Sequence, residues 1–186
     1  MMKKGKNEKS QFGHLMLDLE TMGVDSGSAI TAIAAIEFNI ETGQTGASFY
    51  HKISLQSCVE LGLKIDGRTV QWWLMQNEEA RKEMAKDGIP IIDGLQKFSE
   101  FFSTLPSDIQ IWGNGARFDM GILSDAYIAA KSKIPWKFKN ERDVRTLVSI
   151  FPTLKWIQPM NGTAHNALDD CKHQINYCSK IWKKIK

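Results

Sequence analysis

Long apolar runs are absent from this chain of 186 residues. No stretch reaches the roughly 20 apolar residues that a helix needs to cross a bilayer. The segment from Met1 to Lys6 also lacks the apolar core of a secretory signal. These two absences predict a soluble, cytoplasmic protein with no membrane partner.

Cysteine is scarce as well. The chain has three, Cys58, Cys171 and Cys178, and no two of them are spaced as CxxC. An odd number of widely spaced cysteines predicts neither a disulfide framework nor a zinc site. We therefore expect reduced, buried thiols.

The net charge is low, at +3, and it is unevenly distributed. Residues 1–10 and 180–186 contain eight lysines and one glutamate, so the rest of the chain is net acidic. Basic ends of this kind are usually solvated, and residues 1–11 are predicted to be a disordered basic lead-in. The remainder, 12–186, has no repeat and no low-complexity tract, which predicts a single domain large enough to bury a core.

The segment from Leu15 to Thr21 shows a clear period of two. Its three leucines alternate with Met16, Asp18 and Glu20, which predicts a strand that buries one face and turns the other toward a site. Two carboxylates on the same face repel each other unless a cation or a shared proton offsets the repulsion. The pair is therefore a candidate half of a metal site, although such pairs also occur on solvated strands.

Further elements follow from the apolar pattern. Runs over 29–40 and 47–53 predict two more strands that form an antiparallel meander with the first. A helix is predicted over about 66–86, with Trp73 inside and Trp72 more exposed. One face of this helix carries Val70, Trp73, Leu74 and Asn77. Because strands and helices alternate after this point, the fold class is α/β.

The second half of the chain adds two informative carboxylates and a histidine. Asp119 opens a helix predicted over 119–131, just after a strand predicted over 109–112. Asp170 lies one turn into a final helix predicted over 166–184, and His165 is expected on the loop before it. Taken singly, each has a structural explanation: a helix cap, an acid that complements a helix dipole, and an ordinary loop histidine.

Taken together, these residues form three motifs in a fixed order. The motifs are Asp18-x-Glu20, Asn114-x-x-x-Phe118-Asp119 and His165-x-Ala167-x-x-Asp170. In this order they resemble the exonuclease motifs of the DEDDh branch of the DnaQ-like 3′–5′ exonucleases, over roughly residues 13–182. The stretches 70–74 and 79–81 are also similar to small phage and bacterial exonucleases related to the T-even phage exonuclease and to a mycobacterial exoribonuclease.

The resemblance implies a ribonuclease H-like fold, in which a central mixed sheet carries the meander and later parallel strands between helices. It also implies that Asp18, Glu20, Asp119 and Asp170 hold two Mg²⁺ or Mn²⁺ ions. Independently, oxygen ligands suit such hard cations, and paired cations stabilise the attacking and leaving oxygens of phosphoryl transfer. The choice of Asp170 over Asp169 rests on the family spacing alone.

His165 would be the general base of this family, taking a proton from the attacking water. The sister branch has a tyrosine at that position, and no tyrosine lies near His165 before Tyr177. The resemblance therefore assigns the chain to the histidine branch.

Substrate contacts are predicted from the same positions. Trp72 could stack on a terminal base. Asn114 and Phe118 would position the 3′ nucleotide, and the backbone of Leu19 and Thr21 would contact its sugar.

The resulting hypothesis is an exonuclease that releases nucleoside monophosphates from the 3′ ends of DNA or RNA. One alternative is a catalytically silent nucleic-acid-binding module on the same fold. Another is an endonuclease or other phosphoesterase on that fold, which the His165 motif disfavours without excluding. The sequence leaves open the choice between DNA and RNA and between single-stranded and duplex substrates. The family resemblance is compatible with a homodimer.

Overall fold

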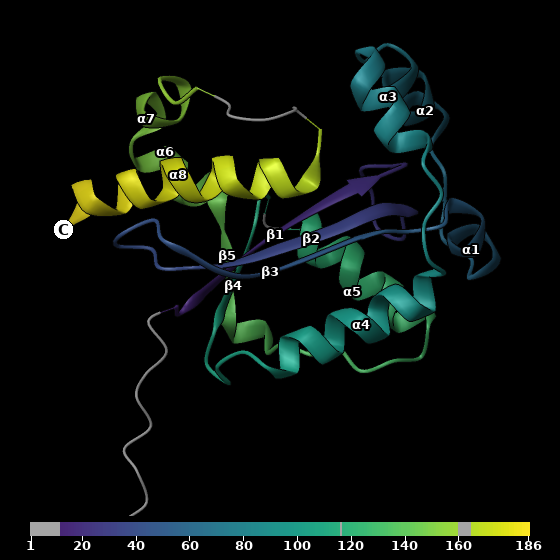
Figure 1. Ribbon diagram of the computed structural model, residues 1–186, viewed down its shortest axis with the longest axis horizontal. Helices are drawn as coiled ribbons and strands as arrows, with labels where there is room; N and C mark the ends of the chain where they lie inside the picture. The colour runs from purple at the N-terminus through teal and green to yellow at the C-terminus, as the bar shows by residue number, and fades with distance from the viewer. Residues whose placement is uncertain (1–11, 116, 160–164) are drawn as a thin grey trace, which may run out of the picture.

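The computed structural model describes residues 12–115, 117–159 and 165–186, so the lead-in predicted for 1–11 lies outside the described residues. Five strands form one sheet in the order β3-β2-β1-β4-β5 (Figure 1). The strands are β1 (His14–Thr21), β2 (Ile30–Phe38), β3 (Thr45–Lys52), β4 (Gln110–Gly113) and β5 (Glu141–Asp143). Strands β1 to β3 pair antiparallel, whereas β4 pairs parallel with both β1 and β5. The predicted mixed sheet is confirmed.

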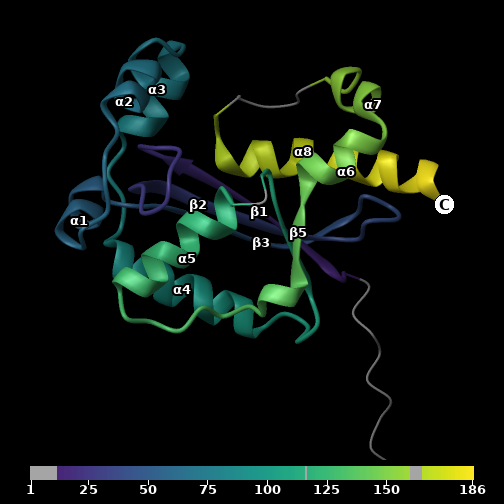
Figure 2. The ribbon, with the colours of Figure 1, turned by 180° about the vertical axis from the view of Figure 1, so that it is seen from behind.

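Helices cover both faces of this sheet. They are α1 (Leu55–Glu60), α2 (Gly67–Leu74), α3 (Glu78–Ala85), α4 (Ile91–Ser103), α5 (Asp119–Ala129), α6 (Val144–Ile150), α7 (Pro152–Trp156) and α8 (Ala167–Ile185), with a short 3₁₀ turn at Phe138–Asn140. Figures 1 and 2 show α4 and α5 on one face and α6, α7 and α8 on the other. Each face has its own buried apolar cluster. This double cover explains why every residue of β2 is buried.

Strand β1 lies at the centre of the sheet and presents a different set of side chains to each face. Leu15, Leu17 and Leu19 belong to the cluster on the α4 and α5 side, as the period of two predicts. The prediction that the other face turns toward a site was wrong at Met16, which is fully buried in the cluster that includes residues of α8. That face opens only farther along the strand, at Asp18 and Glu20.

The helix predicted over 66–86 is two helices. Asn77 is the N-cap of α3 and its side chain accepts a hydrogen bond from the amide of Ala80, so the chain turns there instead of continuing α2. The different exposure of the two tryptophans is confirmed, since Trp73 is 2% exposed and Trp72 is 42% exposed. Helix α2 therefore has one ring in the core and one available at the surface.

Two expectations from composition can be checked in the described part of the chain. Cys58, Cys171 and Cys178 are free and buried, as predicted. Among the described residues, none of the helices has the length and apolar character required to cross a membrane.

His14, at the start of β1, is held in its neutral form. Trp112 donates its Nε1–H to His14 Nδ1 at 3.0 Å. Burial, followed by the nearby charge of Arg142, lowers the pKa of His14 from 6.5 to about 4. At pH values between about 4 and 6.5, the unfolded chain therefore takes up a proton at His14, whereas the folded chain does not.

We expect this contribution to stability to be complete above about pH 6.5 and to be lost as the pH falls toward about 4. The shift corresponds to at most about 3 kcal/mol, and about 1–2 kcal/mol remains after allowance for partial exposure. The stability advantage of the wild type over His14→Gln should therefore shrink by that amount across this pH range, as measured by urea unfolding. An advantage that stays constant would contradict the prediction, and His51→Gln, at a more exposed histidine, should show a smaller pH effect.

Candidate active site

Three carboxylates converge where β1 ends and α8 begins. Asp18 and Glu20 extend from the same face of β1, and Asp170 comes from the first turn of α8, which Asn166 caps. One ligand oxygen from each of the three carboxylates lies within 4.8 Å of the other two. The sheet register shifts between Glu20 and Thr21, and such irregularities often redirect side chains beside active sites.

Asp119, the fourth predicted acid, lies beside this group and is 1% exposed. Strand β4 is parallel to β1, so the loop that follows β4 reaches the same edge of the sheet. Asp119 Oδ1 accepts the amide of Leu19 at 3.1 Å, and Oδ2 accepts the amide of Asn114 at 2.6 Å. These bonds tie the start of α5 to β1.

All four acids hold their protons more tightly than usual. Burial is the first cause in each case. It raises the pKa of Asp18 well above its usual range, with added repulsion from Asp119 and Glu20. The pKa of Glu20 rises to about 8 and that of Asp119 to about 6. Asp170 shifts upward as well, although the backbone amide and charge of His165 oppose the shift.

The donor set fits divalent metal ions. Glu20 Oε1 is buried and, among the described residues, has no hydrogen-bond partner. An unpaired buried carboxylate oxygen is costly unless a cation approaches it. Clustered carboxylate oxygens are the ligands that Mg²⁺ and Mn²⁺ prefer, so Asp18, Glu20 and Asp170 are suited to hold such ions, with Asp119 adjacent.

Glu20→Gln is expected to stabilise the protein in EDTA at alkaline pH. The pKa of Glu20 is about 8 when folded against 4.5 when unfolded, so folding stability falls as the pH rises between these values. The substitution should raise the free energy of unfolding by about 2–4 kcal/mol above pH 8 and change it little near pH 4.5. Thermal unfolding with and without EDTA would measure this, with the exposed Glu79→Gln as a control. A loss of stability at alkaline pH would contradict the prediction.

His165 lies in the turn before α8, as expected, with a positive φ of 65°. Its backbone amide donates to Asp170 Oδ2 at 3.1 Å. Its ring packs edge-to-face against Trp72, with centroids 4.9 Å apart. The histidine therefore borders the acidic group.

These groups line one pocket of about 630 Å³, which is large enough for a nucleotide-sized ligand. Its walls include the acids Asp18, Glu20 and Asp170 together with His165. The predicted substrate residues also line it: Leu19, Thr21, Trp72, Asn114 and Phe118. The structure thus brings these predicted residues to one pocket, and Asp119 accepts the amides of two of them, Leu19 and Asn114.

The predicted substrate residues differ in which of their hydrogen-bonding groups are still unpaired. The Leu19 amide is already bonded to Asp119, and the Thr21 carbonyl accepts the Trp73 Nε1–H at 3.0 Å. Asn114 Oδ1, by contrast, is buried without a hydrogen-bond partner among the described residues. Asn114 is therefore the predicted contact with the clearest unused bonding capacity.

Sequence reasoning missed Gln174. Its Nε2 donates to Asp18 Oδ1 at 2.6 Å, which partly opposes the rise in the pKa of Asp18. Gln174 follows Asp170 by four positions, so the two share a face of α8. This spacing is the signal that could have identified it.

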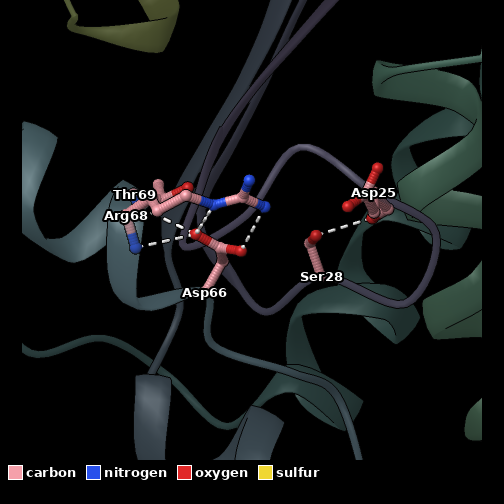
Figure 3. A network of polar contacts seen from close by, with 5 residues as sticks. All are labelled: Asp25, Ser28, Asp66, Arg68 and Thr69. Atoms are coloured by element: carbon pink, nitrogen blue, oxygen red, sulfur yellow. Dashed lines mark hydrogen bonds and ion pairs between the residues drawn. The ribbon is translucent and has the colours of Figure 1, made fainter.

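Sequence reasoning also missed Asp66, Arg68 and Thr69, which line the pocket where α2 begins. Figure 3 shows the polar contacts among them. Asp66 caps α2 by accepting the amides of Arg68 and Thr69, and it pairs with the Arg68 guanidinium at 3.0 Å. The Asp66 amide donates to the Met22 carbonyl at 2.7 Å. The start of α2 is therefore attached to the loop that follows β1.

Comparison with solved structures identifies the fold. The nuclease domain of 3′hExo, a DEDDh family member bound to rAMP, superposes with a TM-score of 0.65 at 13% identity and covers 94% of each chain. E. coli ExoI in complex with ssDNA superposes with a TM-score of 0.62 at 16% identity, covering 93% of this chain and 40% of that one. The fold is thus the ribonuclease H-like fold of the DEDDh exonucleases, as predicted.

Sequence comparison gives the family. The model of the 3′–5′ exoribonuclease Rv2179c-like domain matches residues 13–182. The exodeoxyribonuclease of enterobacteria phage T4 is 28% identical over 192 residues, covering 86% of this chain and 85% of the phage protein. The chain belongs to the Rv2179c-like 3′–5′ exoribonuclease domain family, and it is a hydrolytic 3′–5′ exonuclease. The predicted resemblance is confirmed.

Proposed function

We propose that this protein hydrolyses the terminal phosphodiester bond at the 3′ ends of DNA or RNA and releases nucleoside 5′-monophosphates. One observation carries the proposal. A pocket where β1 ends is bordered by three clustered carboxylates and a histidine, and a fourth carboxylate lies beside this cluster. The family membership supports hydrolysis that proceeds from the 3′ end of the nucleic acid.

Asp18, Glu20 and Asp170 would hold two Mg²⁺ or Mn²⁺ ions, with Asp119 completing the set. When bound, such ions supply charge that stabilises the attacking and leaving oxygens of the phosphoryl transfer. Four carboxylates, whose pKa values are raised chiefly by burial, also gain from the added positive charge.

His165 would act as the general base. Water attacks the phosphorus of the terminal nucleotide, and His165 accepts the proton that this water loses. The bond between phosphorus and the 3′ oxygen of the preceding nucleotide breaks, and that oxygen takes a proton from solvent. The remaining pocket residues, which include Asn114, Phe118 and Trp72, would orient the terminal nucleotide.

The experiment compares 5′-labelled DNA and RNA oligonucleotides of the same sequence, each with a free or a blocked 3′ end. With Mg²⁺ or Mn²⁺, we expect a ladder that shortens from free 3′ ends only, with 5′-mononucleotides identified by mass. EDTA should abolish it, and the relative rates give the sugar preference. Internal fragments would indicate an endonuclease, and binding without cleavage would indicate a silent module.

The homodimer that the resemblance suggests stays a prediction. Light scattering of the purified protein with and without an oligonucleotide would test it.

A further inference from the structure

Two aromatic rings of α2 pack against the imidazole of His165. The Trp72 ring lies 4.9 Å from it between centroids, at an interplanar angle of 84°, and the Trp73 ring lies 5.9 Å away at 79°. The two indoles also meet edge-to-face at 5.1 Å. Edge-to-face contacts at these separations are favourable and directional, so the three rings form a defined cluster.

This cluster is attached to the strand that carries the acids. Trp73 is buried and donates its Nε1–H to the carbonyl of Thr21, at the end of β1. The N-cap of α2, Asp66, donates its amide to the carbonyl of Met22, just beyond that strand. The position of Trp72 is therefore fixed relative to Asp18 and Glu20.

The imidazole of His165 has little else to orient it. Within the described part of the chain, its ring nitrogens make no hydrogen bond, and the bond to Asp170 comes from its backbone amide. Catalytic histidines usually have a third group that orients the ring through a hydrogen bond. Here the contacts with the Trp72 and Trp73 rings are the interactions that orient the imidazole.

We propose that Trp72 is a positioning residue that holds the His165 ring over the carboxylate group. The inference rests on the proposed role of His165 as the general base. It also assigns Trp72 a function beyond stacking on a base, and the two functions have different kinetic effects. Loss of a stacking surface raises KM and leaves kcat unchanged, whereas loss of positioning lowers kcat.

A double-mutant cycle tests the proposal, using Trp72→Ala, His165→Ala and the double variant on a single-stranded oligonucleotide with a free 3′ end. A misplacement of about 1 Å can cost about 100-fold in rate. We therefore expect Trp72→Ala to lower kcat by about 10-fold to 100-fold, in addition to any rise in KM from lost stacking, and Trp72→Phe to restore most of kcat. In the His165→Ala background, Trp72→Ala should have almost no further effect on kcat.

Two results would overturn the inference. One is a rise in KM alone for Trp72→Ala, and the other is a drop in kcat of the same factor with and without His165. If His165→Ala itself keeps the wild-type kcat, the proposed general base is wrong, and the positioning role fails with it. Trp156→Ala, at a tryptophan of α7 that is 78% exposed, is the matched control and should leave kcat and KM unchanged.

Discussion

Replacing His165 with alanine is expected to lower kcat by about 10²-fold to 10⁴-fold, the usual contribution of a general base. The side chain borders the acidic group, and its loss would leave the attacking water without a proton acceptor. Binding of divalent cations and of a 3′ end should persist, because the carboxylates keep their positions. Single-turnover hydrolysis of a labelled oligonucleotide, together with its equilibrium binding, separates the two effects.

The control for this variant is His51→Ala, at a partly exposed histidine on the edge strand β3. It should hydrolyse at the wild-type rate. Wild-type turnover in His165→Ala would show that the proton is taken up elsewhere. A loss of oligonucleotide binding as large as the loss of rate would show that the histidine serves substrate affinity instead.

Asp18→Asn is expected to abolish hydrolysis, with a loss of about 10³-fold or more. Metal ions stabilise the charge of a phosphoryl transfer by several kcal/mol, and each 1.4 kcal/mol corresponds to about tenfold in rate. Asparagine keeps the shape of the side chain, and its carbonyl oxygen can still accept from Gln174. It removes the negative charge at the centre of the group.

The same variant should fold at least as well as the wild type in EDTA, because one repelling buried charge is gone. Circular dichroism and thermal unfolding would establish this. Asp108→Asn, at an exposed aspartate, is the matched control for activity. An active Asp18→Asn would contradict the assignment of the metal site to this cluster.

The parts of the fold that were predictable follow local patterns. The alternation from Leu15 to Thr21 placed Asp18 and Glu20 on one face of a strand, and short turns between apolar runs predicted the antiparallel meander, both as observed. The break between α2 and α3 was missed because Asn77 was assigned to a helical face, whereas its side chain caps α3. Short polar residues bond to the backbone in either setting, so the pattern alone did not separate them.

The arrangement of the site depended on contacts that local pattern does not encode. The sequence motifs predicted that Asp18, Asp119 and Asp170 act together. Their closeness in space follows from the parallel pairing of β4 with β1 and from the packing of α8 against β1. The burial of Met16 under α8 follows from this packing too. The contact between Trp72 and His165 joins segments that no periodicity relates.

The most direct test of the account is a calorimetric titration of Mn²⁺ into the wild type, Asp18→Asn and Asp108→Asn. The account predicts two ions per wild-type chain, at least about tenfold weaker binding in Asp18→Asn, and no change in Asp108→Asn. Binding of equal affinity in all three proteins would contradict the claim that the carboxylates at the end of β1 form the metal site of this exonuclease, as would the absence of binding to the wild type.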